Sequence, residues 1–311
     1  MTHAWHQSIN IHEKLARKLI ESQQHLAVNT IGLLDEGWDN LVYLVNESII
    51  FRFPRREFGV MCMENEIMLL PFIATQVDFP LSTPKWIGHP IASYPYPFAG
   101  YQMLAGQAVS DNGSELMNHS GFAVTFASWL RALHAIPIQE QHVGMLKGDQ
   151  GWRYDVPHRI SRCREMLTKY ERYFLELGFS KTVLLETIAV LPRLIFKEDR
   201  RSYLHGDLYS RHVLMDSVSR MPTGLIDWGD THIGHPGIDL AVGMIFSKET
   251  FQHFLKAYGP VDSSTFHLLL LHAFCHHMSF LPYTCERDKV QLRHWASMVL
   301  TRVMDEIWML F

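Results

Sequence analysis

Two short stretches carry the most information in this chain: HGDLYSRHVL at residues 205–214 and GLIDWGD at residues 224–230. The first places Asp207 in a loop that leads into an apolar run, and the second places Asp227 at the end of another apolar run. We expect the two carboxylates at the ends of adjacent strands. Such a pair suits phosphoryl transfer, in which one carboxylate accepts the proton of an attacking hydroxyl and the other holds Mg²⁺ on the nucleotide phosphates.

A short hairpin would bring these two carboxylates together. Phosphoryl transfer needs positioning and charge neutralisation more than covalent help. The base must lie within hydrogen-bond distance of the substrate hydroxyl, and the metal ligand must lie on the phosphate side. The residues MPTG at 221–224 are a turn signal between the two stretches, so we expect the turn of the hairpin there.

Both stretches resemble the catalytic loop and the metal loop of the antibiotic phosphotransferases, which share the bilobal fold of protein kinases. A third segment, GHPGIDLA at residues 234–241, resembles the G-D-P-x-x-D-L-A segment of that family. An isolated H-G-D or D-W-G is not diagnostic, but three segments in this order favour the kinase-like interpretation. The departure is His235, where the family usually has Asp. The resemblance implies that Asp239 is structural and braces the catalytic loop, and a structural role is also expected for His134.

The resemblance implies a role for each motif residue. Asp207 would be the catalytic base and Asp227 a metal ligand. The family has a metal-binding Asn where this chain has His212, and Mg²⁺ prefers oxygen ligands, so His212 is expected to take part weakly or indirectly. His212 and the D-W-G-D run resemble the macrolide branch of the family more than the aminoglycoside branch.

Composition excludes several other classes of protein. The chain has 311 residues, enough for two domains or one bilobal unit, and 47% of them are hydrophobic. The net charge of −4 argues against a nucleic-acid partner. No apolar run is long enough for a membrane span, and no secretory signal is visible. Four cysteines without C-x-x-C spacing are typical of reduced thiols, so we expect a cytoplasmic protein, and a monomer.

Hydrophobic periodicity predicts an α+β fold with a small β-rich N-terminal lobe and a larger helical C-terminal lobe. In the first lobe we expect helices at 8–25 and 57–72, the latter stopped near Pro71, and strands at 41–45, 48–53 and within 86–103. In the second lobe we expect helices at 113–135, 157–177, 266–281 and 292–311. Residues 104–107 look like the segment that crosses between the two lobes. The expected domains are a nucleotide-binding lobe at 1–104, with the hinge at its end, and a catalytic and acceptor-binding lobe at 105–311.

The nucleotide side has no Walker sequence, which disfavours P-loop kinases. The resemblance points instead to residues 36–40, EGWDN, between a helix and the first strand, as the loop that covers the phosphates, with Asn40 at its end; an ordinary hairpin turn is the alternative. Arg52 would take the place of the kinase Lys on the phosphates, and Glu66 would pair with it. A surface charge on an edge strand is the alternative for Arg52. Arg55 and Arg56, also part of the macrolide-branch pattern R-x-P-R-R, are expected to be solvated.

The nucleotide base would bind backbone groups near Gln102, Met103 and Leu104. Backbone contacts leave little record in the side chains, so the sequence leaves GTP and ATP open as donors. The macrolide branch commonly uses GTP, which is an implication of the resemblance only.

The acceptor is expected to bind against the C-terminal helices. Residues 266–281 contain four His and no carboxylate, which argues against polycationic aminoglycosides and for a large, mostly apolar acceptor such as a macrolide. Asp230 would pair with the macrolide ammonium group or assist the metal. The remaining residues expected at the acceptor are mostly aromatic, although most apolar residues of the C-terminal helices simply belong to the core: Tyr209, Phe274, Met278 and Tyr283.

The predicted function is therefore transfer of the γ-phosphate of GTP or ATP to the 2′-hydroxyl of a macrolide, which would inactivate the antibiotic and confer resistance. One alternative is a kinase of a small metabolite, an amino alcohol or a sugar, on the same fold. Another is a pseudokinase that only binds, kept open by His212 and His235. The i, i+4 spacing of His272 and His276 also permits zinc, although no third ligand stands out.

Overall fold

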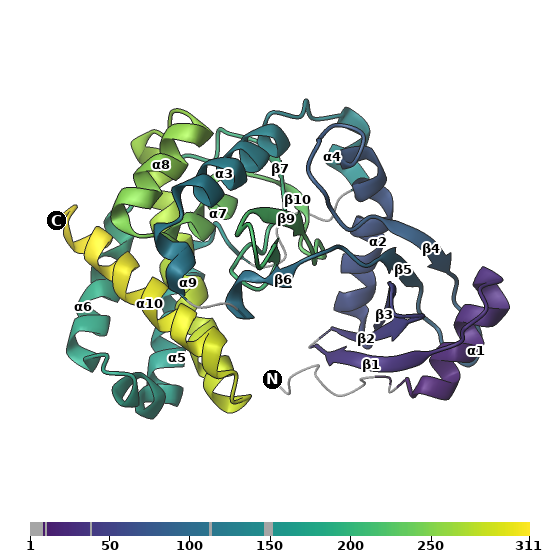
Figure 1. The fold of residues 1–311 in the computed structure, drawn as a ribbon. Helices are drawn as coiled ribbons and strands as arrows, with labels where there is room; N and C mark the ends of the chain where they lie inside the picture. The colour runs from purple at the N-terminus through teal and green to yellow at the C-terminus, as the bar shows by residue number, and fades with distance from the viewer. Residues whose placement is uncertain (1–8, 10, 38, 112–113, 146–151) are drawn as a thin grey trace. The chain divides into compact units, whose positions relative to one another are not determined.

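The computed structural model describes residue 9 and residues 11–37, 39–111, 114–145 and 152–311. Its contacts divide the chain into two compact units (Figure 1). The first consists of Met1–Ala105 and Gly224–Thr231, and the second of Gly106–Thr223 and His232–Phe311. The assignment of a nucleotide-binding lobe to 1–104 and an acceptor-binding lobe to 105–311 stays a prediction.

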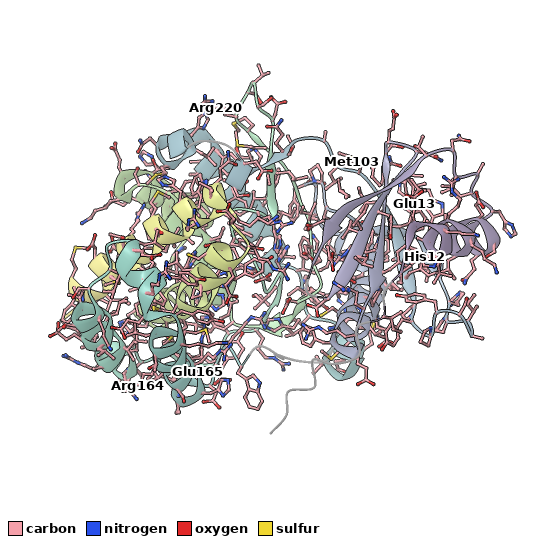
Figure 2. The ribbon with its side chains drawn as sticks, turned by 90° about the horizontal axis from the view of Figure 1, so that it is seen from below. His12, Glu13, Met103, Arg164, Glu165 and Arg220 are labelled. Atoms are coloured by element: carbon pink, nitrogen blue, oxygen red, sulfur yellow. The ribbon has the colours of Figure 1, made fainter. Side chains whose placement is uncertain are left out.

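The first unit is built on a five-stranded antiparallel sheet in the order β1-β2-β3-β5-β4. Its strands are β1 (Ile31–Glu36), β2 (Asn40–Val45), β3 (Ile49–Pro54), β4 (Pro84–Gly88) and β5 (Phe98–Gln102). Two helices accompany the sheet: α1 (Glu13–Gln24) and α2 (Glu57–Ile73). The imidazole Nδ1 of His12 caps α1 by accepting a hydrogen bond from Leu15 N at 3.2 Å (Figure 2).

The hairpin of β2 and β3 forms as predicted, with Val45 paired to Ile49. Asn46 and Glu47 in its turn have φ of 48° and 58°, the left-handed conformation that a tight hairpin requires at both central positions. Strand alternation then buries Phe51 and Phe53 completely. The Phe53 ring stacks on that of Phe98 at 4.7 Å, so aromatic packing holds β3 and β5 in the core.

One expectation about the first unit is wrong, and another is off by one residue. Residues 37–39 follow a strand, β1, and not a helix; β1 lies at the sheet edge with mostly exposed side chains, so it lacks the alternation that marks a strand. Helix α2 forms as predicted and ends at Ile73, one residue after the predicted end, and Ala74 N still donates to Leu70 O. The missing N–H of Pro71 costs one bond, whereas the last turn buries Leu70 and Ile73 completely.

The second unit is mostly helical, as predicted. Its longer helices are α3 (Ser120–His134), α5 (Val156–Glu176), α6 (Lys181–Val190), α8 (Lys248–Tyr258), α9 (Ser263–Glu286) and α10 (Val290–Trp308). Helix α9 packs against α5 and α10, and α3 packs against α8. The predicted start of a helix at Gly113 lies outside the described residues; α3 itself begins at Ser120, after a 3-10 turn at Ser114–Asn118.

Short strands in the second unit present the motif loops. Strand β7 (Ser202–Leu204) pairs with β10 (His232–Gly234), and a second small sheet has the order β6-β8-β9, formed by Gln107–Ala108, Val213–Met215 and Pro222–Leu225. Strand β9 carries the chain from the second unit into the first.

The hairpin between β8 and β9 turns earlier than predicted. Residues 222–225 form strand β9, so the turn signal read at 221–224 was misplaced. The Asp216 carboxylate accepts from Ser219 N at 2.7 Å and from Val218 N at 3.2 Å, and Arg220 has φ of 55° (Figure 2). An Asp that bonds its own turn closes the hairpin, and Pro222 then sits at the first position of a strand, where its missing N–H is tolerated.

Candidate active site

Arg52 lies at the centre of the polar cluster in the first unit. Its Nη1 donates to Glu66 Oε1 at 2.6 Å, and its Nη2 donates to Asp227 Oδ1 at 2.7 Å. Strand β3 presents the guanidinium, helix α2 presents Glu66, and the chain after β9 presents Asp227. Three of the predicted site residues are thus brought together, although Arg52 and Asp227 lie 175 positions apart in the sequence. The alternative that Arg52 is a surface charge on an edge strand is wrong.

Burial sets the electrostatics of this cluster. Burial raises the pKa of Glu66, although the Arg52 guanidinium opposes the shift. Burial by itself lowers the pKa of Arg52, but the Asp227 and Glu66 carboxylates outweigh it, and the pKa lies well above its usual value. Arg52 therefore remains a cation at any working pH, with its two-pronged donor geometry fixed.

Tyr101 completes the cluster and was missed from the sequence. Its hydroxyl donates to Glu66 Oε2 at 2.7 Å, so both carboxylate oxygens of the fully buried Glu66 are hydrogen-bonded. Tyr101 lies on β5 inside an apolar stretch, where it looks like any core aromatic residue. No motif in the sequence signals this contact.

Asp227 is held in an unusual backbone conformation. Its φ is 62°, and the segment that follows packs closely: a Cβ on Gly229 would lie 3.2 Å from Cys62 Cβ and 3.4 Å from Glu66 Oε1. A larger residue there would push these neighbours on α2 back by a few tenths of an ångström. The Asp227 side chain remains 46% exposed, so its carboxylate is accessible while one oxygen bonds Arg52.

The loop between β1 and β2 is short and tightly closed. Gly37 N donates to Asn40 O at 3.0 Å. Asn40 is buried, and its Oδ1 has no hydrogen-bond partner among the described residues. Trp38 lies outside the described residues. Arg55 and Arg56 are not solvated as expected, since Arg55 pairs with Glu36 and Arg56 with Asp39.

The predicted base-binding segment follows β5. Gln102 Nε2 and Met103 N both donate to Ser48 O at 2.9 Å, so the N–H of Met103 is already used inside the first unit (Figure 2 labels Met103). The Met103 side chain is 47% exposed, and that of Leu104 lies against Gly224. Base binding by these three residues stays a prediction.

In the second unit, a single carboxylate organises the loop of Asp207. Asp239, in the short helix α7 (Gly237–Leu240), accepts from His205 N at 2.8 Å and from Gly206 N at 2.9 Å. It also accepts from His134 Nε2 at 3.1 Å. Burial by itself raises the pKa of Asp239, but these donors outweigh it, and the pKa lies below the usual 3.8. The bracing role that the resemblance implied for Asp239 is confirmed by these contacts, as is a structural role for His134.

Asp207 lies in the loop that Asp239 braces, with its side chain 29% exposed. His212 Nδ1 bonds the backbone carbonyl of Asp207 at 2.8 Å and lies 3.7 Å from its Oδ2. Because a carbonyl can only accept, Nδ1 must carry the proton. The His212 ring also packs on that of Tyr209, with centroids 4.3 Å apart, so the loop is stiffened on both sides.

Only some of the residues predicted for acceptor binding lie together. Tyr209 and Tyr283 are linked through Phe280, whose ring centroid is 4.8 Å from that of Tyr209 and 5.9 Å from that of Tyr283. Phe274 and Met278 instead lie fully buried in the core. Asp230 belongs to the first unit. Burial raises the pKa of Asp39, and the negative charge of Asp230 raises it further.

Tyr209 also lines a small cavity in the second unit, with about 10 Å³ open to the centre of a water molecule. This space holds about one water. Its other linings come from the Asp207 loop, α9, α10 and the chain after α7: Leu208, Ser210, Ala241, Val242, Ile245, His272, Ala273, His276, His277, Phe280, Trp295, Ala296 and Val299.

Three buried histidines of α9, His272, His276 and His277, are electrically neutral. Burial lowers the pKa of His272 and of His276 well below 6.5, and neighbouring cationic groups including Arg159 lower both further. Burial lowers the pKa of His277 to about 4. Arg159 Nη1 donates to His272 Nδ1 at 3.0 Å, so that nitrogen is occupied. The described residues contain no group of three His, Cys, Asp or Glu side chains arranged to hold a metal, which leaves the zinc alternative without support.

No helix within the described ranges is long and apolar enough to cross a membrane.

Comparisons with known proteins bear on the fold and the family. Structures of similar fold include the GDP complex of aminoglycoside 2'-phosphotransferase-IIIa (21% identity, TM-score 0.70, covering 96% of this chain and 100% of that chain). A macrolide 2'-phosphotransferase from Brachybacterium faecium (18% identity, TM-score 0.61, 93% and 98%) and the streptomycin-ATP ternary complex of APH(2")-IIa (16% identity, TM-score 0.59, 94% and 97%) are also similar.

These likenesses confirm the predicted α+β protein-kinase-like fold. Residues 30–267 match the protein family described as "Phosphotransferase enzyme family". The match spans β1 through the first turns of α9 and includes Arg52, Glu66, Asp207 and Asp227. Since more than half of the chain is matched, the protein belongs to the phosphotransferase enzyme family.

Proposed function

We propose that this protein transfers the γ-phosphoryl group of GTP or ATP to a sugar hydroxyl of a macrolide, the 2′-hydroxyl, and so inactivates the antibiotic. The observation that carries the proposal is the bridge in which Arg52 joins Glu66 at 2.6 Å and Asp227 at 2.7 Å. A buried cation shared between a helix carboxylate and a loop carboxylate matches the parts that kinases use on the donor nucleotide.

Arg52 would bind the phosphates of the donor. Glu66 fixes one edge of the guanidinium from the core, and Tyr101 fixes Glu66 in turn. The guanidinium is therefore positioned before the nucleotide arrives, and little side-chain entropy is lost on binding. Asn40, whose buried Oδ1 has no partner among the described residues, ends the loop that would cover the phosphates.

Mg²⁺ would bind through Asp227. An exposed carboxylate is the ligand type that Mg²⁺ prefers, and the Asp227 side chain is 46% exposed. His212 fits less well, because its side chain is only 6% exposed and its Nδ1 faces the backbone of Asp207. When bound, the ion would neutralise charge on the phosphate oxygens. His212 would then act by stiffening the loop of Asp207.

Asp207 would orient the acceptor hydroxyl and take its proton. Asp239 holds the backbone of His205 and Gly206, and His212 holds the carbonyl of Asp207, so the loop is fixed on both sides of the reacting carboxylate. A base held in this way needs no rearrangement to meet the hydroxyl. Its exposed side chain leaves room for an acceptor.

The electrostatics of α9 favour a macrolide over an aminoglycoside. The described helix has its one carboxylate, Glu286, at its C-terminal end, and Arg159 is buried against His272. A polycation needs carboxylates, whereas a largely apolar acceptor can pack on the row formed by Tyr209, Phe280 and Tyr283. The single ammonium of a macrolide would pair with Asp230. The similar structures include an enzyme named as an aminoglycoside phosphotransferase and another named as a macrolide phosphotransferase. They also include one complex with GDP and one with ATP.

Mass spectrometry tests the proposal directly. The purified protein, Mg²⁺ and either GTP or ATP are incubated with a panel of macrolides, aminoglycosides, amino alcohols and sugars. We expect one added phosphate on macrolides alone, and a loss of about 10²- to 10⁴-fold in kcat for Asp207→Ala. The matched control is Asp199→Ala, which removes an exposed carboxylate of the same unit.

Each other outcome leads to a different conclusion. Phosphorylated aminoglycosides would overturn the acceptor class but keep the reaction. Products with an amino alcohol or a sugar alone would support the metabolite kinase. Nucleotide binding without any product, or activity that survives in Asp207→Ala, would contradict the proposed reaction.

A further inference from the structure

Two consecutive arginines hold the loop that follows β1. Arg55 Nη1 donates to Glu36 Oε1 at 2.7 Å and to Gly37 O at 3.4 Å. Arg56 Nε donates to Asp39 Oδ1. Both ends of the loop are therefore fastened by side chains that leave the same point, the end of β3.

The backbone strengthens this attachment. Arg55 N donates to Asp39 O at 2.7 Å, which extends the contact of β2 with the segment after β3. A Cβ on Gly59, in the first turn of α2, would lie only 2.6 Å from Asp39 O. Glycine at this position lets the loop backbone lie directly on α2. The loop is thus anchored by side chains and by close backbone packing within one unit.

A phosphate-covering loop with few glycines needs such anchoring. Gly37 is the only glycine in residues 36–40, so side chains limit how closely the backbone of this loop can approach phosphates. Asp39 also brings a negative charge into a loop that is to lie on an anion. Burial raises the pKa of Asp39, and the Arg56 hydrogen bond counteracts that shift. Without Arg56, the partly buried Asp39 carboxylate would lose its ion-pair partner in a loop that is to lie on an anion.

We propose that Arg55 and Arg56 are positioning residues that clamp the described residues Glu36, Gly37 and Asp39 of the loop that would cover the donor phosphates. This inference rests on the proposed function, because it takes the loop to be the phosphate-binding segment. The clamp acts through the loop: Arg55 fixes its first half through Glu36 and Gly37, and Arg56 fixes its second half by neutralising Asp39. Neither arginine is the phosphate ligand in this scheme.

The test compares ligands with and without phosphates. The dissociation constants of the triphosphate and of the matching nucleoside are measured by calorimetry for both bases, guanine and adenine. We expect Arg56→Gln to raise Kd for the triphosphate by about tenfold, the loss expected for one charge-assisted hydrogen bond, and to leave the nucleoside Kd unchanged. Arg55→Gln should act in the same direction. Arg17→Gln, which removes an ion pair with Glu21 on α1 and a hydrogen bond to Val28 O, is the matched control away from residues 36–40 and should leave both constants unchanged.

A double-mutant cycle separates the clamp from direct phosphate binding. In an Asp39→Asn background the anion is gone, so Arg56→Gln should raise the triphosphate Kd by less than about threefold. If Arg56 touched the phosphates itself, the variant would cost the same factor in both backgrounds. Equal factors would overturn the clamp, and so would equal losses for triphosphate and nucleoside, which would indicate general unfolding of the unit.

The same data distinguish failure of the clamp from failure of the proposed reaction. If no acceptor is phosphorylated but the triphosphate-specific loss appears, the clamp stands and the reaction assignment fails. If macrolides are phosphorylated and Arg56→Gln binds the triphosphate like wild type, the clamp fails and the reaction stands. Absence of nucleotide binding by the wild-type protein would overturn both.

Discussion

The substitution Asp239→Asn should strongly destabilise the second unit, although the Asn and Asp side chains have nearly the same shape. Three donors converge on the wild-type carboxylate: His205 N and His134 Nε2 on Oδ2, at 2.8 Å and 3.1 Å, and Gly206 N on Oδ1, at 2.9 Å. An amide offers one acceptor oxygen and one NH₂ group. In either orientation of Asn, at least one buried backbone N–H therefore faces another donor.

The magnitude follows from counting these contacts. Each buried donor left without an acceptor costs about 1–3 kcal/mol, and the charge assistance of the remaining bonds is lost as well. One or two donors are affected, so we expect a decrease of about 2–4 kcal/mol in the free energy of unfolding. The loop of Asp207 loses its brace in the same step, so kcat should fall with it.

Urea unfolding followed by circular dichroism measures the change in stability, with Asp216→Asn as the control. Asp216 also accepts backbone hydrogen bonds, but in an exposed turn, so its variant should cost less than about 1 kcal/mol. Because the pKa of Asp239 is depressed below 3.8, its contribution is fully present above pH 3.8 and is lost as the pH falls through the folded-state pKa. The difference between wild type and variant should accordingly stay constant from about pH 5 to 8.

An Asp239→Asn protein within about 0.5 kcal/mol of wild type at pH 7 would refute this reasoning. It would mean that the convergent hydrogen bonds do not hold the loop. A difference that grows as the pH falls from 7 to 5 would also contradict it, because the sign of the linkage would then be wrong.

Three further predictions concern other parts of the chain. Arg52→Lys keeps the charge but cannot bond Glu66 and Asp227 in the same two-pronged way, so nucleotide Kd should rise by about tenfold in calorimetry. Gly106→Ala should cost about 3 kcal/mol in urea unfolding, since φ is 112° and the new Cβ would lie 2.3 Å from Thr223 Oγ1, whereas Gly178→Ala, with φ of 85° and open space, should cost about 1 kcal/mol. The pKa of His277 falls from 6.5 to about 4 on burial, so its contribution is full above pH 6.5 and declines towards pH 4. Wild type should lose about 2 kcal/mol more than His277→Gln between pH 7 and pH 5, and equal losses would disprove this assignment.

The polar cluster around Arg52 was predictable from the sequence up to its last member. Arg52 was recognisable as a cation inside a strand of apolar residues, and Glu66 and Asp227 followed from the resemblance. Tyr101 was not predictable, because a tyrosine in an apolar strand is equally consistent with a core position. Only the pairing of β5 with β3 brings its hydroxyl to Glu66.

The loop-anchoring role of Arg55 and Arg56 shows a second limit. Consecutive arginines after a strand normally point to solvent, and local pattern gives no reason to expect partners 17 and 19 positions earlier. The pairing of β2 with β3 returns the chain to the loop, so long-range register creates both ion pairs. The turn predicted at 221–224 was misplaced for a local reason. Asp216 closes the hairpin by hydrogen bonds within its own turn, and these compete with the turn signal of Pro222, six residues later.

The sequence by itself determined the fold class and the residues of the family motifs, because strand periodicity and motif spacing are local properties of the chain. Only the tertiary structure decided which of those residues touch. Arg52 meets Asp227 across 175 positions, Asp239 reaches back to His205, and Phe274 and Met278 turn out to be core. Contacts of this kind depend on strand pairing and helix packing, and the free energy that fixes them comes from burial across the whole unit rather than from any single segment.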